Sequence, residues 1–388
     1  MSEETLPWAA AWADPEIAPW SKAVRDAIPT DDFWDAHTHI GTNDPDGFRL
    51  SAADLLGGLE RAGARGVVFP MHEPDGYPPA NDMVLEAAAD SGGRLVAFCR
   101  VDPRDSAVAE AARCLDAGAR GIKLHPRAER FSLDEPAVGE LVALAHERRL
   151  PVLIHAGRGI PALGRHAVEL AERYADVRLI LAHAGICDLS WIWRDAQRLP
   201  NLYFDTAWWS PADLLTLVSH VPPGQVLWAS DAPYGSSLIA QSLGLRCAMQ
   251  AGLTGPQLAS VAGGQMRRLV EGEDPLDAGP AVPGGVRAPD LLLERVHTFL
   301  IAAVARMFEG GDGSESIALA RLACDVDPDG PQAAVCAQIV ALLDRGEAFA
   351  ERHAAHAGSL GRPLRLPFTI IATSISRTPD APLPPLHA

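Results

Sequence analysis

Two histidines stand two residues apart near the start of the chain, in the run Asp35-Ala36-His37-Thr38-His39. In an extended chain, residues two apart point the same way, so His37 and His39 aim two imidazoles at one point. That geometry suits chelation of a zinc-like divalent ion. By itself the pair is a weak signal, because two nearby histidines are more often surface or helix-capping residues.

Further polar residues stand at the ends of later apolar runs. Each has an ordinary alternative: a histidine there is usually a hydrogen-bonded core residue, and Asp231 or Asp205 could cap the helix that follows. The combination favours a functional site, because histidines end three separate runs and an aspartate ends a fourth. The polar residues at these later positions are His72, Lys123, His125, His155, His183, Asp205 and Asp231.

Eight short apolar runs carry these residues, and amphipathic Ala/Leu-rich stretches separate them. Short runs that are apolar on both faces suit parallel strands covered on each side. Their alternation with helices over roughly 240 residues predicts an α/β fold, a (β/α)8 TIM barrel, with its active site at the carboxyl ends of the strands. A doubly wound open sheet competes, but the first run lacks the Gly-rich turn of that fold. The runs are 33–37, 66–70, 95–100, 120–125, 151–155, 178–183, 201–205 and 225–231.

The chain divides into four parts by composition. Residues 1–30 form an N-terminal segment, residues 31–271 the barrel, and residues 272–290 a linker rich in Gly, Pro and Asp. Residues 291–388 form a helical extension that ends in a Pro-rich tail, which we expect to be frayed. The extension could cover the site, mediate dimerisation or bind a partner. Its helical periodicity covers 291–308, 316–327 and 332–355.

The net charge is −17, with 50 acidic and 33 basic residues. Such a surface repels phosphate backbones and anionic lipids, so we expect neither nucleic acid nor a membrane as partner. The six cysteines form no C-x-x-C pair and have apolar neighbours, as expected of buried free thiols in a reducing compartment. No secretory signal and no apolar run of membrane-spanning length is visible in the sequence, so we expect a cytoplasmic location.

The order of motifs along residues 31–271 resembles the amidohydrolase superfamily, and within it the amidohydrolase-related branch (amidohydrolase 2) of mostly mononuclear metal enzymes. Each motif alone is unspecific, whereas their combined order is specific. The matching stretches are DAHTHIG (35–41), RVDP (100–103), GIKLHP (121–126), IHAGRG (154–159), LAHAG (181–185), FDT (204–206), SDAPYG (230–235) and GGQMRRL (263–269).

The resemblance implies roles for the residues at the strand ends. His37, His39, His155 and Asp231 would be the metal ligands, and His183 and Asp231 would be catalytic in proton transfer. In binuclear members, His183 would instead bind a second ion. One Zn²⁺ is the first expectation, and Mn²⁺, Fe²⁺ or Co²⁺ are compatible. Such an ion lowers the pKa of bound water from 15.7 to about 7.

Four further residues are candidates for substrate binding. We expect Lys123 to be an unmodified amine near the substrate, although some superfamily members carboxylate a lysine at the fourth strand. His125 could face the substrate or pack at the rim, and Arg158 could bind a carboxylate bidentately or be a solvated loop charge. His72 has weaker support because its surroundings, HEPDGYPP, are loop-like. Trp34, Trp208 or Trp209 could form an aromatic pocket or belong to the core.

Two departures from the family pattern are visible. Gly264-Gln265 replaces the usual Gly-Asn before the final Arg-rich helix, and the helical extension is not part of the common barrel. The first is expected to affect a helix cap and packing, and the second leaves the role of the extension open.

Three functions are compatible with these residues. The first is a metal-dependent hydrolase that uses metal-activated water on an amide, lactone or related C–N or C–O bond of a small molecule. The alternative is a metal-dependent, non-oxidative decarboxylase (a lyase) of an unsaturated or aromatic carboxylic acid. The third is a barrel retained as a scaffold for a protein contact, which the complete ligand set argues against. A homo-oligomer is compatible with all three.

Overall fold

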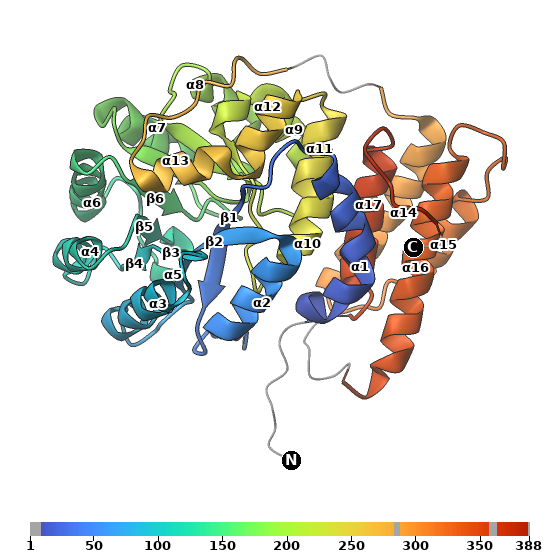
Figure 1. Cartoon of the computed structure of the whole chain (residues 1–388), viewed down its shortest axis with the longest axis horizontal. Coiled ribbons are helices and arrows are strands. Elements are labelled where there is room, and N and C mark those ends of the chain that lie inside the picture. The colour runs from blue at the N-terminus through green and yellow to red at the C-terminus, as the bar shows by residue number, and fades with distance from the viewer. Residues whose placement is uncertain (1–8, 283–287, 357–362, 387–388) are drawn as a thin grey trace.

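The computed structural model describes residues 9–282, 288–356 and 363–386. It contains a barrel of parallel strands, which confirms the predicted TIM barrel (Figure 1). The eight predicted runs form strands, and the third run divides into two at Phe98. The strands are β1 (Phe33–Ile40), β2 (Ala64–Pro70), β3 (Leu95–Ala97), β4 (Cys99–Arg100), β5 (Ile122–Leu124), β6 (Pro151–Ile154), β7 (Arg178–Leu181), β8 (Leu202–Asp205) and β9 (Val226–Leu227).

Backbone hydrogen bonds close the barrel at two places. Neighbouring strands pair in the orders β1-β2-β3 and β4-β5-β6-β7-β8-β9. The Phe98 N–H donates to the Val68 carbonyl at 2.9 Å and joins the two groups of strands. At the other seam, the Ala36 N–H donates to the Trp228 carbonyl at 3.0 Å, and the Asp231 N–H donates to the His37 carbonyl at 2.8 Å. The first strand therefore lies beside the segment that follows the last one.

Helices surround the strands and bury their apolar faces. The first helix of this ring, Ala52–Ala62, is capped by Ser51, whose side chain accepts from the Asp54 N–H. It ends at Gly63, which is in the left-handed region. Inside the barrel, Phe69, Phe98 and Tyr203 belong to a separate buried cluster. The larger helices of the ring are α2 (Ala52–Ala62), α3 (Pro78–Asp90), α4 (Ala107–Asp116), α6 (Pro136–Glu147), α7 (Leu163–Arg173), α8 (Leu189–Ala196) and α9 (Pro211–His220).

Short helical segments follow β5 and β9. They include α5 (Pro126–Glu129), α10 (Ser237–Ala240), the π-helical η3 (Gln241–Leu245), α11 (Arg246–Gln250), α12 (Gly255–Ala259), η4 (Ser260–Gly264) and α13 (Gln265–Glu271). Before the barrel, α1 (Ala9–Asp26) buries Ile17, Trp20 and Val24 and packs against α10 and η3. The N-terminal segment of the sequence prediction thus contains a packed helix, and its residues 1–8 lie outside the described part.

The C-terminal extension is a helical layer beside the barrel (Figure 1). It consists of α14 (Leu291–Phe308), α15 (Ser314–Ala323), α16 (Ala333–Arg352) and α17 (Leu366–Arg377). α17 packs against α14 and α16 on one side and against α1 and α9 on the other, so it joins the extension to the barrel. The sequence analysis did not predict α17. Residues 283–287 of the predicted linker lie outside the described residues.

The Pro-rich tail is held by hydrogen bonds from the barrel and from α16, which corrects the expectation that it is frayed. The buried guanidinium of Arg246 donates to the Thr378 carbonyl at 2.7 Å and also to the Pro382 carbonyl. Gln338 donates to the Pro384 carbonyl at 2.6 Å. These donors fix residues 378–384, because carbonyls that accept from buried side chains are not free to fray. The last two residues, 387–388, are outside the described part.

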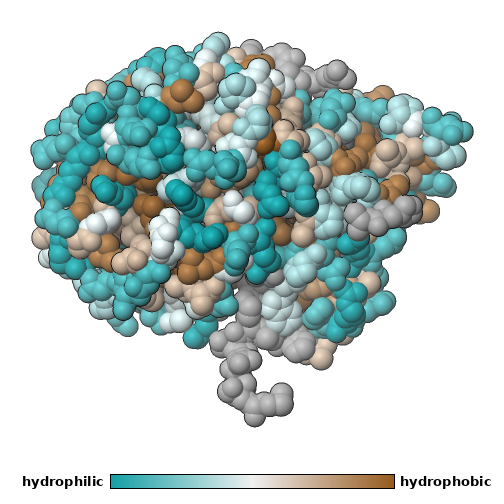
Figure 2. Space-filling view, viewed as in Figure 1, coloured by the Kyte–Doolittle hydropathy of each residue, from teal (hydrophilic) through white to brown (hydrophobic). Residues whose placement is uncertain are grey.

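The surface in view is mostly hydrophilic, with hydrophobic side chains in separate patches (Figure 2). All six cysteines are free, as predicted; five are buried and Cys187 is half-buried. Among the described residues, no helix combines the length and apolar character needed to cross a bilayer.

Candidate metal centre and active site

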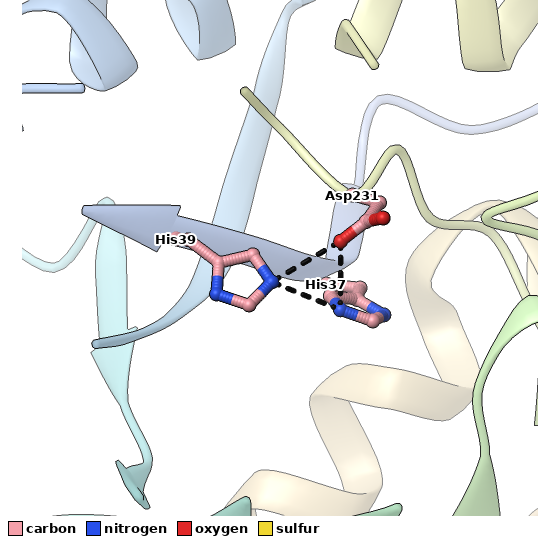
Figure 3. Close-up of side chains that lie close together, drawn as sticks. All are labelled: His37, His39 and Asp231. Atoms are coloured by element: carbon pink, nitrogen blue, oxygen red, sulfur yellow. Dashed lines mark hydrogen bonds and ion pairs between the residues drawn. The ribbon is translucent and has the colours of Figure 1, made fainter. Parts of the chain in front are cut away.

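Three of the four predicted ligands converge on one point. His37 and His39 lie on β1, and Asp231 follows β9, 192 residues further along the chain (Figure 3). The Nε2 atoms of the two histidines are 3.2 Å apart, and Asp231 Oδ1 lies 3.0 Å from His37 Nε2 and 3.1 Å from His39 Nε2. Ligand atoms about 3.3 Å apart are expected around a tetrahedral ion with bonds of about 2.0–2.1 Å. The triangle therefore has the size of one face of such a site.

Hydrogen bonds on the far side of each ring set the tautomers. His37 Nδ1 lies 2.8 Å from Asp205 Oδ2, and His39 Nδ1 lies 3.3 Å from the Pro70 carbonyl. Both partners only accept, so each Nδ1 carries a proton and each neutral ring turns an unprotonated Nε2 toward Asp231. When both rings are neutral, two imidazole lone pairs and a carboxylate oxygen face one another. A cation relieves this repulsion, so the donor set fits a divalent ion.

The charges at the triangle agree with this conclusion. Burial raises the pKa of Asp231, but His37, His39 and His183 outweigh it and hold the pKa well below its usual range. Burial lowers the pKa of His39 to about 3. A neutral His39 and an ionised Asp231 at neutral pH are the forms that bind a metal.

The pKa of His37 shifts in the opposite direction from that of His39. Burial and Lys123 lower its pKa, whereas Asp231 and Asp205 together raise it above its ordinary value. Without an ion, two neighbouring carboxylates favour a proton on this ring. A divalent cation at the triangle would compete with that proton, because metal binding releases protons from its ligands.

Two buried aspartates hold the triangle from behind. Asp205 is fully buried, and its Oδ1 accepts the His183 N–H at 2.8 Å and the Ala207 N–H at 3.0 Å, while Oδ2 faces His37. Such carboxylate–histidine pairs orient metal ligands. The sequence analysis noted Asp205 at a strand end and named only a helix-capping role for it. Its position after an apolar strand, with Thr206 in the FDT motif, was the available signal for a role in the site.

Asp35 connects the first strand to the loop that carries Asp231. Its carboxylate accepts the Ser230 N–H at 2.9 Å, the Ser237 hydroxyl at 2.7 Å and the His37 N–H at 3.3 Å. This residue therefore positions both parts of the triangle without pointing into it.

The backbone at the strand ends is in an uncommon conformation. Asp231 has φ of 60°, and His183 and Ala184 each have φ of 58°, in the left-handed region that residues other than glycine rarely adopt. The Asp231 conformation is held by its N–H, which donates to the His37 carbonyl, and by its own carbonyl, which accepts from Gly235 at 3.1 Å. Strained residues held in this way cluster at functional sites.

The fourth predicted ligand, His155, lies beside the triangle and not in it. Its Nδ1 is 2.9 Å from His183 Nε2, and the Nδ1 of His183 is 2.8 Å from the Ala207 carbonyl. His183 therefore accepts at Nε2, and His155 donates. Among the described residues, the buried Nε2 of His155 has no hydrogen-bond partner. Gly157 permits this placement, since a Cβ there would lie 2.6 Å from that Nε2. The ligand role of His155 stays a prediction.

Lys123 lies at the triangle but is sealed from solvent. Its Nζ is 3.3 Å from His37 Nε2 and 4.7 Å from the centre of the Phe69 ring. Burial lowers its pKa to about 7. The side chain does not line the pocket described below. We therefore expect Lys123 to act beside the candidate metal ligand His37.

His125 and His72 do not reach that pocket. His125 stacks on His155 with ring centres 3.8 Å apart, and its Nδ1 accepts the Ala128 N–H at 3.1 Å and caps α5. This is the packed rim position that the sequence left open. His72 lines a different and larger cavity of about 610 Å³, with Arg104 and other charged side chains. Neither residue lines the candidate active-site pocket, and their role in substrate binding stays a prediction.

A pocket of about 330 Å³ opens at the triangle. Asp231, His183 and His155 line its polar part, and for this reason we identify it, and not the larger cavity, as the candidate active site. Its volume is in the range of small-molecule sites. Trp208 and Trp209 also line it, as one sequence hypothesis proposed, whereas Trp34 is buried and belongs to the cluster inside the barrel.

Two arginines stand at the same pocket. The guanidinium of Arg158 lies 5.3 Å from the centre of the Trp208 ring, and Arg127 contributes to the lining. Neither has a carboxylate partner within the described ranges 9–282, 288–356 and 363–386. Sequence reasoning missed Arg127, which follows the GIKLHP motif directly and could have been found as a cation near a strand end.

Comparison with known proteins identifies the family. The profile of the family described as Amidohydrolase matches residues 14–246, so the chain belongs to this family of metal-dependent enzymes. A search of curated proteins found no significant match.

Solved structures share the fold at low sequence identity. A 2,6-dihydroxybenzoate decarboxylase from Rhizobium is 16% identical with a TM-score of 0.50, and the same enzyme type with bound 2,6-dihydroxybenzoate is 15% identical with a TM-score of 0.51. An uncharacterised TIM-barrel protein from Bordetella bronchiseptica is 16% identical with a TM-score of 0.51. Each match covers 62% of this chain and 99% of the other.

Proposed function

We propose that this protein is a metal-dependent hydrolase that cleaves an amide, lactone or related C–N or C–O bond of a small molecule. The observation that carries the proposal is the triangle of His37, His39 and Asp231. Hydrogen bonds at the Nδ1 atoms of both histidines leave their Nε2 atoms free to bind a cation. When bound there, a divalent ion supplies a Lewis acid that polarises water or a substrate oxygen. We expect one Zn²⁺, with Mn²⁺, Fe²⁺ or Co²⁺ as alternatives.

The residues of the chain would manage the protons. Asp231 lines the pocket and stays ionised, so it can accept a proton from an attacking water. His183 and His155 share one proton between Nε2 and Nδ1, which makes this pair a second proton-handling group. Burial keeps the pKa of both histidines below the ordinary value, so the pair is neutral at neutral pH and can take up a proton during the reaction.

A carboxylate on the substrate would explain the pair of arginines. Arg158 and Arg127 are cations at the pocket of a strongly acidic protein, and guanidinium groups bind carboxylates bidentately. The face of Trp208 beneath Arg158 keeps that guanidinium near the opening of the pocket.

Decarboxylation is the second candidate. The two arginines favour it because they suit an acidic substrate, and solved structures of the same fold include a decarboxylase of 2,6-dihydroxybenzoate. In that reaction the bond between the substrate carbon and its carboxylate would break, carbon dioxide would leave, and a proton from water, passed on by His183 or Asp231, would take its place.

Metal content and a substrate panel test the proposal together. The protein, produced in metal-supplemented medium, is expected to contain about one divalent ion per chain. His37→Ala with His39→Ala is expected to lose it, whereas the control pair His146→Ala with His220→Ala, on helices of the outer ring, keeps it. The loaded enzyme is then assayed for hydrolysis of lactones and amides and for carbon dioxide release from aromatic acids. A metal-free parent protein, or an unchanged stoichiometry in the His37/His39 variant, refutes the site.

A further inference from the structure

The C-terminal extension contributes a wall of the candidate active-site pocket. Phe308, the last residue of α14, lines it together with Leu366 and Ile370 from the first turns of α17. All three lie beyond residue 246, where the match to the family profile ends. The wall is therefore a feature that this chain adds to the common barrel.

The wall is part of the packed core. Leu366 and Ile370 are only 1% and 7% exposed. Phe308 meets Trp209, which follows β8, with ring centres 5.3 Å apart and planes at 51°. Arg246 of the barrel anchors the other end of α17 through Thr378, whose hydroxyl and carbonyl accept at 3.0 and 2.7 Å. The apolar wall therefore has a fixed position opposite the barrel.

The two sides of the pocket differ in chemistry. Asp231 and His183 lie on the barrel side, where Arg158 also stands. The extension side adds only apolar groups, and Trp208 and Trp209 continue that surface. A ligand that filled such a pocket would need a charged end and an apolar portion.

We propose that the extension selects the substrate: this enzyme acts on carboxylates that carry an apolar chain or ring, which packs against Phe308, Leu366 and Ile370. The proposal rests on the proposed function, because it takes the arginine-lined pocket as the site of reaction. It assigns the extension a role in substrate specificity in place of the dimerisation or partner binding that the sequence left open.

Binding of linear alkanoates tests the wall without requiring turnover. We would titrate the metal-loaded full chain calorimetrically with butanoate, hexanoate, octanoate and decanoate. Each methylene that enters an apolar pocket is expected to tighten binding about fourfold. Phe308→Ala and Ile370→Ala should reduce that increment to about twofold or less. Leu322→Ala, at an exposed leucine on α15 (66% exposed), is the matched control and should keep the wild-type increment.

The variants distinguish the contribution of the apolar wall to binding from that of the arginine that would bind the carboxylate. Arg158→Gln should weaken all four alkanoates by a common factor and leave the increment per methylene unchanged. Thermal melting and metal content establish that each variant is folded, and Phe308→Leu repeats the test with a smaller loss of volume. No chain-length dependence in the wild type, or an unchanged increment in both wall variants, overturns the proposal. Binding that depends on chain length, without any hydrolysis or carbon dioxide release, would refute the proposed reaction but not the proposed role of the wall in binding.

Discussion

Replacing Asp205 with asparagine should weaken metal binding although Asp205 does not face the ion site. Its Oδ1 accepts two backbone N–H groups, from His183 and Ala207, so in the Asp205→Asn variant the amide oxygen must keep that position and the NH₂ group must replace Oδ2. That NH₂ group would face His37 Nδ1, which lies 2.8 Å from Oδ2 in the parent, and would force this nitrogen to accept. The proton of the ring then moves to Nε2 and points into the triangle. Because the ring must lose that proton before it can bind a cation, the substitution acts on the metal through the tautomer of His37.

The expected effect follows from the bonds that change. A hydrogen bond to a charged group contributes about 1.5–3 kcal/mol, which corresponds to roughly 10-fold to 150-fold in affinity. Loss of a carboxylate partner behind a histidine ligand typically costs about 10-fold to 100-fold in metal affinity. We therefore expect Asp205→Asn to raise the Kd for Zn²⁺ by about 10-fold to 100-fold. Competition with a chromophoric chelator measures this Kd, and Asp116→Asn, at an exposed aspartate on α4, is the control. A variant that is folded and binds Zn²⁺ as tightly as the parent would refute the tautomer argument.

Three further predictions concern other parts of the molecule. Gly157→Ala should lower kcat with little change in Tm, because the added Cβ would lie 2.6 Å from His155 Nε2 and displace that ring. A kcat equal to that of the parent would contradict the placement of His155. Burial and Arg377 lower the pKa of His297 to about 4, so the unfolded state binds more protons between about pH 4 and 6.5, and stability is lost as the pH falls through that window. His297→Gln should remove about 3 kcal/mol of this loss in the free energy of unfolding, measured by urea titration at several pH values. If the free energy of unfolding falls with pH as steeply in the variant as in the parent, the prediction is wrong. Arg246→Gln should destabilise the protein by about 1–3 kcal/mol, because the buried Thr378 carbonyl loses its donor; unfolding at the parental urea concentration would rule this out.

The barrel and the His37–His39 pair could be predicted because both follow from short-range periodicity. Alternating apolar runs and amphipathic stretches specify strands and helices, and a period of two places both imidazoles on one side of β1. The orientation of His155 could not be predicted, because a contact with His183, 28 residues away, sets its rotamer. The pairing of Asp205 with His37 spans 168 residues and is equally invisible to local patterns.

The helix α17 was missed for a different reason. Its sequence, LPFTIIATSISR, is rich in threonine, isoleucine and serine, which have lower helix propensity than alanine or leucine. Every residue from Leu366 to Ser376 is buried between the barrel and the rest of the extension. Packing on all sides therefore stabilises a helix that the intrinsic propensities of its residues do not favour, and sequence patterns alone report only the propensities.

The position of the triangle links the metal to the integrity of the barrel. His37 and His39 belong to the first strand and Asp231 to the segment after the last, so the ligands lie on both sides of the seam where the barrel closes. The backbone bonds at this seam are few, since β9 itself is only two residues long. An ion held by all three ligands would join chain segments 192 residues apart and would bind only the closed barrel. Its binding free energy would then stabilise the folded state by mass action, because the unfolded chain does not bring these ligands together. The same residues would in this way provide both the reactive centre and the closure of the fold that positions it.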